Sequence, residues 1–267
     1  MPIKSNFFLK LVLEQNKLFI VPFSESPLNP FMNKLTNNIE LDVKISPWLT
    51  GLAYPLGKYV ILPTFFRQLT VSGQENIPRT GPLIVAPTHR SRWDAIVVPH
   101  ATGKLVSGRN VRYMVSADEM KGLQGWFIKR MGGFPVDTRR PGVSTMRRSV
   151  EILCKDEMLV VFPEGGIFRD NTVQTLKEGI GRIALQAQSQ HEGESVKVLP
   201  VSVRYNQAIP SWGADVFVDI GKPIDVANYT DMATKQGAKK LMGDLNIKLK
   251  ELHEVEITSE SWVMNVN

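Results

Sequence analysis

One histidine and one aspartate form a pair that could move a proton. They are His89 and Asp94, five positions apart in the segment His-Arg-Ser-Arg-Trp-Asp. A histidine that is oriented by a carboxylate is the usual construction of a general base that acts on a hydroxyl or thiol near neutral pH. The plainer alternative is a surface loop in which the aspartate only caps the following helix. This segment by itself leaves both interpretations open.

The flanking residues indicate that the pair lies at a turn from a strand to a helix. Residues 83–86 form the apolar run Leu-Ile-Val-Ala between Pro82 and Pro87, which predicts a short buried strand. From Asp94 onward, apolar residues recur with helical spacing. We therefore expect His89 and the aspartate to meet on a loop that rigid elements fix on both sides.

Further along the chain, short apolar runs alternate with segments of helical spacing. We expect strands at 69–72, 83–88, 111–115, 133–137, 158–162, 197–204 and 215–220. We expect helices at 94–101, 119–131, 143–155, 177–189 and 236–253. This alternation is typical of an α/β layered domain, with a central, largely parallel (mixed) sheet flanked by helices.

The first 66 residues differ from this alternating part. Residues 1–45 have mixed polarity and no clear period, which predicts an irregular arm. Residues 47–66 concentrate aromatic and aliphatic side chains but also contain prolines and a lysine. This composition fits a helical segment in a membrane interface, and equally a pair of helices packed on the core. We expect an N-terminal arm with an interfacial helical segment at 1–66, and the α/β domain at 67–267.

The composition is that of a folded, basic chain. Of 267 residues, 43% are hydrophobic and 22% charged, which supports a real core and argues against disorder. The net charge of +6 is concentrated in residues 88–150, which hold twelve Lys or Arg against four acids. This basic stretch suits an anionic substrate, an anionic membrane surface or nucleic acid, and its alternative is an ordinary solvated face. Aromatic residues are few among these charges, so we expect no nucleic-acid partner.

The cysteine and the histidines narrow the chemistry. Cys154 is the only cysteine, which excludes a disulfide framework and fits a reducing compartment. It lies in an apolar stripe of helical spacing and is expected in the core. His100, His191 and His253 have no partner at metal-ligand spacing, so we predict no metal. The chain has no G-x-S-x-G elbow that would indicate a serine hydrolase, and no uncharged apolar span of transmembrane length.

Four motifs follow one another along the chain, at residues 89–94, 132–140, 161–166 and 198–201. The second begins Gly-Gly-Phe-Pro-Val, the third reads Val-Phe-Pro-Glu-Gly-Gly, and the fourth reads Val-Leu-Pro-Val. Each motif is weak alone, but their order and spacing together resemble the glycerolipid acyltransferase family. The resemblance covers about residues 65–225, and the first and third motifs are its most specific parts.

The resemblance implies a reaction. His89 would deprotonate a glycerol hydroxyl of the acceptor, and Asp94 would hold the ring and stabilise the imidazolium. The hydroxyl would attack an acyl thioester of acyl-carrier protein or coenzyme A directly, without an enzyme nucleophile or any cofactor. The implied acceptor is 1-acyl-sn-glycerol-3-phosphate and the product phosphatidic acid, as in phospholipid synthesis. The alternatives are another acceptor, such as glycerol-3-phosphate or another lysolipid, or a non-catalytic basic module that binds membranes or nucleic acid.

The resemblance also implies residues that bind the glycerol phosphate of the acceptor. Glu164 and Gly165 match the F-P-E-G motif of the family. The second motif of the family ends in an arginine that contacts phosphate. Thr138 stands where that arginine is commonest, so the role passes to Arg139, with Arg140 as a second candidate.

Two more cations follow the third motif. The family usually continues with Thr-Arg-Ser after the glycine, whereas this chain has Gly-Ile-Phe and then Arg169. The guanidinium of Arg169 is expected to supply the missing cation, because its reach and fork suit phosphate. Lys177 matches a lysine that the family carries shortly after this motif and would add to the anion site.

The same resemblance implies a membrane-associated protein, peripheral or monotopic, at the cytoplasmic face. Its partners would be a lysophospholipid acceptor, an acyl-carrier protein or acyl-coenzyme A donor and an anionic membrane surface. A second apolar group at 120–131 contains Trp126 and Phe127 and is accompanied by Lys121, Lys129 and Arg130. That pattern suits a helix in an anionic headgroup layer, unless its aromatic residues are part of the core.

Overall fold

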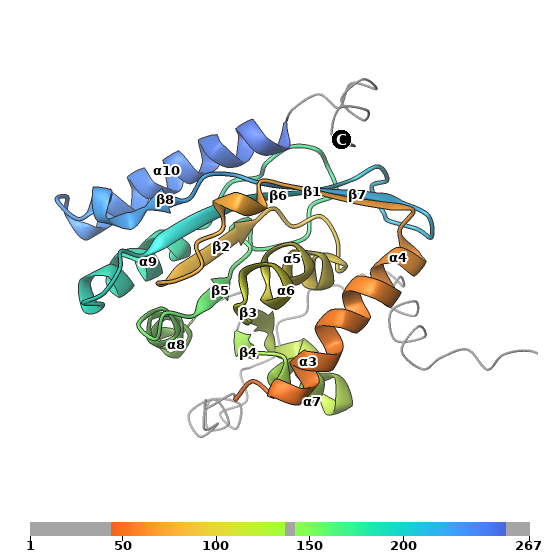
Figure 1. Ribbon diagram of the computed structural model, residues 1–267. Helices are drawn as coiled ribbons and strands as arrows, with labels where there is room; N and C mark the ends of the chain where they lie inside the picture. Colours follow the sequence, from red (N-terminus) through yellow and green to blue (C-terminus); the bar gives the residue numbers. More distant parts are fainter. Residues whose placement is uncertain (1–43, 137–141, 255–267) are drawn as a thin grey trace, which may run out of the picture. The chain divides into compact units, whose positions relative to one another are not determined.

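The computed structural model describes residues 44–136 and 142–254 (Figure 1). Within these ranges eight strands form one sheet, in the order β1-β7-β6-β2-β5-β3-β4, with β8 paired to β6. The strands are β1 (Gln68–Ser72), β2 (Leu83–Pro87), β3 (Val111–Ser116), β4 (Gly133–Val136), β5 (Met158–Val160), β6 (Lys197–Tyr205), β7 (Asp215–Ile220) and β8 (Ile224–Asp225). The seven expected strands are all present, whereas β8 is too short to leave a sequence pattern.

The sheet is mixed but mostly parallel. Five of the seven strand pairs are parallel, and β6 pairs antiparallel with both β7 and β8. β7 pairs with the end of β6, and β8 with its beginning, so the two strands share one edge of β6. The expected fold class, an α/β domain with a central, largely parallel sheet, is confirmed.

Helices make the crossovers between the parallel strands, as the alternating pattern predicts. They are α5 (Asp94–Thr102) and α6 (Lys104–Ser107) before β3, α7 (Gly122–Arg130) before β4, α8 (Val143–Leu153) before β5 and α9 (Gly179–Gln190) before β6. The last helix, α10 (Thr234–His253), follows β8. Single turns of 3₁₀-helix lie at Gln74–Asn76, Ala117–Glu119 and Val226–Tyr229. The five expected helices are confirmed, and α6 is an additional short one.

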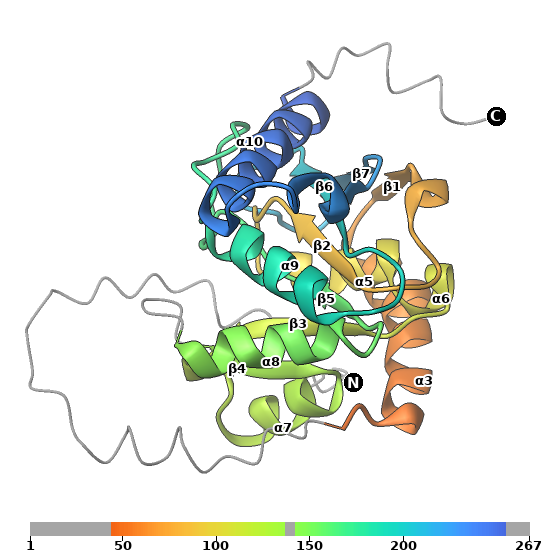
Figure 2. The same cartoon turned by 90° about the vertical axis from the view of Figure 1, so that its left-hand side faces the viewer.

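Each face of the sheet carries its own hydrophobic core. In β2, Leu83 and Val85 point to one face and Ile84 and Ala86 to the other, and all four are buried. Apolar residues on both sides of a strand are typical of a sheet that helices cover on both faces. Figure 2 shows α8, α9 and α10 on one side of the strands and α3, α5 and α6 on the other.

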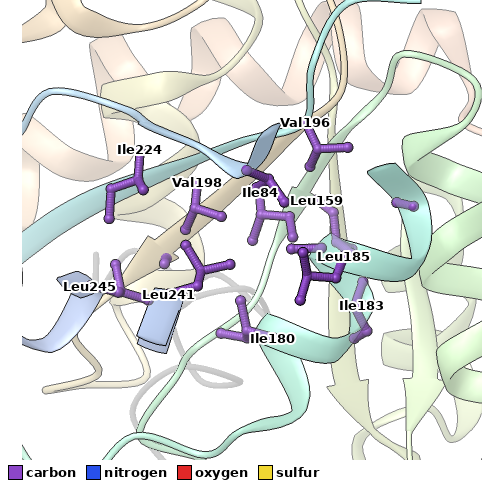
Figure 3. Close-up of a cluster of buried hydrophobic side chains, with 14 of the residues drawn as sticks. Ile84, Leu159, Ile180, Ile183, Leu185, Val196, Val198, Ile224, Leu241 and Leu245 are labelled. Carbon is purple, nitrogen blue, oxygen red and sulfur yellow. The ribbon is translucent and has the colours of Figure 1, made fainter. Parts of the chain in front are cut away.

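Neighbouring strands and the helices α8, α9 and α10 build the first of these cores. Figure 3 shows strand residues packed against helix residues, among them Ile84, Leu159, Val198, Ile180, Leu185, Leu241 and Leu245. The apolar stripe of α10 supplies Leu241, Leu245 and Leu249, all of them buried. This packing fixes α10 against β6 and α9, and it brings the end of α10 to the carboxyl end of β6.

The segment before β1 is helical and has two unlike faces. It consists of α3 (Pro47–Leu56), a π-helical turn (Gly57–Ile61) and α4 (Leu62–Phe65). Pro55 lies inside this run, and a proline removes one backbone hydrogen bond. The π-turn that follows is a known way to absorb such an irregularity. One face packs in the second core through Tyr54, Leu62 and Phe65, while the other is exposed.

Among the helices within residues 44–136 and 142–254, none combines the length and the apolar character needed to cross a membrane.

Candidate active site

The carboxyl ends of three neighbouring strands meet at the candidate site. β2 lies between β5 and β6 and is parallel to both, so the residues that follow these strands share one edge of the sheet. His89 follows β2, Glu164 follows β5, and Tyr205 ends β6. In open α/β sheets this edge is where ligands bind.

The structure brings His89 and Asp94 together. α5 begins at Asp94, and the Nδ1 atom of His89 lies 2.8 Å from its Oδ2 atom. A carboxylate at the first turn of a helix is favoured by the helix dipole. Because a carboxylate only accepts, Nδ1 carries the proton of this hydrogen bond when the ring is neutral. The lone pair is then on Nε2.

Three further donors hold the buried carboxylate of Asp94. Oδ2 accepts the backbone N–H groups of Arg90 at 2.7 Å and Ser91 at 2.9 Å, and Oδ1 accepts the hydroxyl of Tyr205 at 2.6 Å. Burial, and then the charge of Asp94, raise the pKa of Tyr205 well above 10, so the phenol stays a donor. The aspartate thus turns back to the preceding loop and does not cap α5, whose N-cap residue is Trp93.

The imidazole ring of His89 is fixed on one face as well as at one edge. It stacks on Phe162, with ring centroids 3.8 Å apart and an angle of 18° between the planes. The backbone carbonyl oxygen of His89 accepts the backbone N–H of Phe168 at 2.9 Å. The side chain keeps 18% of its surface exposed. A ring held in this way, with Nε2 free of the aspartate, has the arrangement that a general base needs.

Glu164 faces the protein. Its Oε2 atom accepts the backbone N–H of His89 at 2.9 Å and Nη1 of Arg90 at 2.7 Å. Its Oε1 atom accepts Nη2 of Arg90 at 3.1 Å and the backbone N–H of Gln174 at 2.9 Å. The side chain is fully buried. The residue that the resemblance assigns to the acceptor therefore directs both carboxylate oxygens to protein donors, and it joins the loop after β5 to the loop after β2.

Arg90 is a site residue that the sequence motifs did not single out. Besides its two bonds to Glu164, its guanidinium donates to the carbonyl oxygens of His89 at 3.2 Å and Thr172 at 3.0 Å. Its Nε donates to Nε2 of His253 at 3.0 Å. A guanidinium has five N–H groups, and these five bonds use all of them. The signal that could have found it is its position between the two residues of the proton-transfer pair.

His253 is a second residue that sequence reasoning missed. The sequence places it at the end of the expected helix 236–253 and gives it no role, yet only 1% of its surface is exposed. Besides Arg90, it contacts the hydroxyl of Ser202, which lies 2.9 Å from Nδ1. Burial, and then the charges of Arg90 and Arg204, lower its pKa to about 3. The imidazole is therefore neutral in the physiological pH range.

Of the cations expected in an anion site, Arg169 lines a cavity of about 170 Å³ next to these residues. Its lining residues are Arg90, Arg169, Asp170, Asn171, Arg204, Tyr205, Asn206, Gln207 and Ala208. Arg169 itself is exposed. The cavity therefore adjoins Tyr205, the donor to Asp94, and exposes an arginine to solvent.

Gly165 and Lys177 lie against each other. Gly165 has a φ of +73°, and a Cβ atom there would stand 3.2 Å from Cγ of Lys177. The backbone N–H of Lys177 donates to the carbonyl oxygen of Pro163 at 2.8 Å. Glycine is the residue that takes this conformation without strain, and it lets the lysine stem cross the Pro-Glu-Gly turn.

Arg139 and Arg140 fall at residues 137–141, outside the described residues, as do Asp137 and Thr138. Their relation to the rest of the site therefore stays a prediction.

Part of the basic stretch has a structural role. Arg109 donates to the carbonyl oxygens of Pro78, Thr80, Gly81 and Asp156. Other arginines pair with acids, in the pairs Arg92–Glu119, Arg112–Glu157 and Arg148–Glu151. The charge excess of the sequence is thus not wholly available to a ligand.

Cys154 lies away from this edge of the sheet. Cys154 is half-buried against the first core, and burial, followed by the charge of Asp156, raises the pKa of its thiol. Among the described residues, no cluster of His, Cys, Asp and Glu could hold a metal ion.

Comparisons with known proteins point to one family. The family model described as Acyltransferase matches residues 68–204, half of the chain. The 1-acyl-sn-glycerol-3-phosphate acyltransferase of Bacillus subtilis is 25% identical over 189 residues, which are 68% of this chain and 86% of that protein. The enzyme of the same name from Streptococcus pneumoniae is 25% identical over 176 residues, 64% of this chain and 60% of that protein.

A solved structure shares the fold. The crystal structure of the 1-acyl-sn-glycerophosphate (LPA) acyltransferase PlsC from Thermotoga maritima superposes with a TM-score of 0.59 at 22% identity. The match covers 79% of this chain and 81% of that one. The matched residues 68–204 include His89, Asp94 and Glu164. The chain therefore belongs to the acyltransferase family and is an enzyme of the O-acyltransferase class.

Proposed function

We propose that this enzyme transfers a fatty acyl group from a thioester to the free hydroxyl of 1-acyl-sn-glycerol-3-phosphate and so makes phosphatidic acid. The observation that carries the proposal is the contact between Nδ1 of His89 and the buried carboxylate of Asp94. The names of the two curated relatives support the choice of acceptor.

In the proposed mechanism His89 is the general base. Nε2 takes the proton of the acceptor hydroxyl as the oxygen attacks the thioester carbonyl. The C–S bond then breaks, and the imidazolium returns its proton to the leaving thiolate. Asp94 stabilises the imidazolium and, with Tyr205 and two backbone N–H groups, keeps the ring in place. No covalent enzyme intermediate is needed.

The acceptor phosphate is proposed to bind beside Arg169 and Lys177, with Arg139 and Arg140 as further cations. Support comes from the cavity that Arg169 lines and from its place next to Tyr205. Glu164 is proposed to act indirectly, because its oxygens already accept four protein hydrogen bonds. Gly165 shapes the turn over which Lys177 lies.

The enzyme is proposed to work at an anionic membrane surface, which is where such an acceptor resides. One side of the helical segment 47–61 exposes an apolar face to solvent. This exposed apolar face consists of Trp48, Leu52 and Leu56 on α3, and of Tyr59 and Val60 in the π-helical turn. The spacing places these residues on one side of a helix, and an exposed apolar group of this kind marks an interaction site.

A second exposed group lies next to it, on α7. The backbone N–H of Ser46, before α3, donates to the carbonyl oxygen of Arg130, at the end of α7, at 2.9 Å, and Figures 1 and 2 show the two helices close together. Leu123 and Trp126 are exposed on α7, and the guanidinium of Arg130 lies over the ring of Trp126. Apolar groups beside cations suit a headgroup layer.

The substrate is tested by offering the purified enzyme one labelled acyl thioester, on coenzyme A or on acyl-carrier protein, with a panel of acceptors. The panel contains 1-acyl-sn-glycerol-3-phosphate, glycerol-3-phosphate and lysophosphatidylcholine. We expect phosphatidic acid to form fastest. Faster acylation of glycerol-3-phosphate or of the choline lipid would contradict the proposed acceptor. It would not contradict the proposed acyl-transfer mechanism.

Membrane association is tested with liposomes of phosphatidylcholine containing increasing phosphatidylglycerol. Binding should rise with the anionic lipid, since each basic residue near the surface contributes about 1 kcal/mol. The double variant Trp48→Ser, Trp126→Ser should bind less than wild type. Ile247→Ser, an exposed apolar residue of α10, is the matched control. If wild type fails to sediment with anionic liposomes at low salt, this part of the proposal is wrong.

A further inference from the structure

A buried chain of hydrogen bonds connects the last helix to the backbone of His89. At one end, the Nδ1 atom of His253 lies 2.9 Å from Oγ of Ser202 on β6. At the other end, its Nε2 atom lies 3.0 Å from Nε of Arg90. All three residues are buried, with 1% of His253 and 4% of Arg90 exposed. The link spans 163 positions of sequence between His253 and Arg90.

The chemistry of the two partners fixes the proton on His253. An arginine guanidinium only donates hydrogen bonds, so Nε2 of His253 must accept. The ring is then a neutral imidazole with its proton on Nδ1, which donates to Ser202. A protonated ring would carry a hydrogen on Nε2 and would face the Arg90 guanidinium with a like charge. The contact therefore exists only with the neutral form.

From Arg90 the chain continues to both backbone groups of His89. Arg90 donates to the carbonyl oxygen of His89 at 3.2 Å. It also binds both oxygens of Glu164, and Glu164 accepts the N–H of His89 at 2.9 Å. The peptide groups on either side of the proposed base are thus held by one ion pair. The remaining N–H group of the Arg90 guanidinium is on Nε, and His253 accepts it.

We propose that His253 is a positioning residue for the acyl-transfer reaction and acts through Arg90 on the placement of His89. This inference rests on the proposed role of His89 as the base. His253 lies beyond residues 68–204, the part that the family model matches, so the C-terminal helix of this chain completes a site formed by the matched region. α10 then does more than cover the sheet.

Three substitutions separate positioning from packing. The side-chain amide oxygen of glutamine can reach the place of Nε2 and accept from Arg90, whereas asparagine reaches only as far as Nδ1. Leucine fills the space and accepts nothing. We expect His253→Leu and His253→Asn to lower kcat about 10- to 100-fold, the scale of a misplaced catalytic group. His253→Gln should restore most of the loss.

Acceptor KM is the internal control of this experiment. The proposed phosphate site beside Arg169 does not include His253, so KM should change by less than about threefold in all three variants. His191→Gln, in the loop after α9, should leave kcat at the wild-type value. Urea denaturation of each variant shows whether it is folded under the assay conditions.

A double-variant cycle tests the route through Arg90. Arg90→Lys keeps a charge for Glu164 but has no Nε donor, so adding His253→Leu to it should lower kcat little further. Equal kcat for the glutamine, asparagine and leucine variants, or losses that multiply in the double variant, would overturn the proposal. A wild type that acylates another acceptor would contradict the proposed substrate instead, and the same variants can then be compared on that acceptor.

Discussion

The loop after β2 and the loop after β5 meet at the same edge of the sheet, but they hold their polar side chains in opposite ways. In the loop after β2, Arg90, Ser91 and the following Asp94 are buried. Each of them has partners in the protein. In the loop after β5, Arg169 and Lys177 are exposed, and only Glu164 turns inward.

This difference separates the chemistry from the choice of acceptor. A proton-transfer pair needs fixed geometry, because small displacements of a reacting group are costly. Exposed arginine and lysine side chains on a loop bind an anion without such constraint, and one of them can replace another. The departure from the usual Thr-Arg-Ser sequence after Gly165 falls in this second region. We therefore expect this chain to differ from its relatives more in the acceptor that it binds than in its proton-transfer chemistry.

The largest effect is expected at Asp94. Asp94→Asn keeps the shape of the side chain but removes the charge that stabilises the imidazolium. We expect kcat to fall about 10²- to 10⁴-fold, the range for loss of acid–base catalysis. Steady-state kinetics with saturating acceptor measures this, and Asp118→Asn, at an exposed aspartate, is the control. A loss of only a few-fold would show that the buried carboxylate is structural.

Glu164 should matter more for stability than any cation of its loop. Glu164→Gln leaves Arg90 buried without its counter-charge, and breaking a buried ion pair in this way costs about 3–5 kcal/mol. Urea denaturation should show that loss in the free energy of unfolding. Glu178→Gln, which breaks the exposed pair with Arg182, should cost less than about 1 kcal/mol. Equal costs at the two positions would contradict the contrast between the two regions.

Arg169 should affect binding and leave turnover nearly unchanged. If its guanidinium contacts the acceptor phosphate, Arg169→Ala removes a charge-assisted hydrogen bond worth about 1.5–3 kcal/mol. Acceptor KM should rise accordingly while donor KM stays the same. Arg182→Ala, on α9, serves as the control for a lost exposed charge. Equal increases in acceptor KM and donor KM would show that Arg169 does not bind the acceptor specifically.

A further effect concerns the pH dependence of stability, and its measured part between pH 6.5 and 5 is modest. His253 has a pKa of about 3 when folded, against 6.5 ordinarily, so only the unfolded chain takes up this proton between those values. The free energy of unfolding should therefore fall as the pH drops below 6.5, by up to about 1.4 kcal/mol per pH unit from this group. His253→Gln should show a shallower fall between pH 6.5 and 5 in urea denaturation. Identical slopes would mean that the folded and the unfolded chain take up this proton over the same pH range, so that burial does not lower the pKa of His253.

Local sequence patterns predicted the strands and helices because both faces of the sheet are covered. A strand buried on both sides, such as 83–86, is a continuous apolar run, and helices such as α8 and α9 are amphipathic. The pairing of His89 with Asp94 was also predictable, since the two residues flank one turn. The two-residue β8 and the short α6 carry no comparable pattern.

The residues that the motifs missed are joined to the site by contacts of long sequence separation. Tyr205 is 111 positions from Asp94, and His253 is 163 positions from Arg90. A signal for His253 nevertheless exists, because it continues the buried stripe of Leu245 and Leu249 by one more interval of four residues. A polar residue at a buried position of an amphipathic helix needs a partner, and that rule points to a site contact.

The central claim is that His89 is the base that activates the acceptor hydroxyl. The most direct test is the single-turnover rate of acyl transfer by His89→Ala, with acceptor and donor both saturating, in a preparation whose unfolding curve matches wild type. The account predicts a rate about 10²- to 10⁴-fold below wild type. A rate within a few-fold of wild type would contradict it.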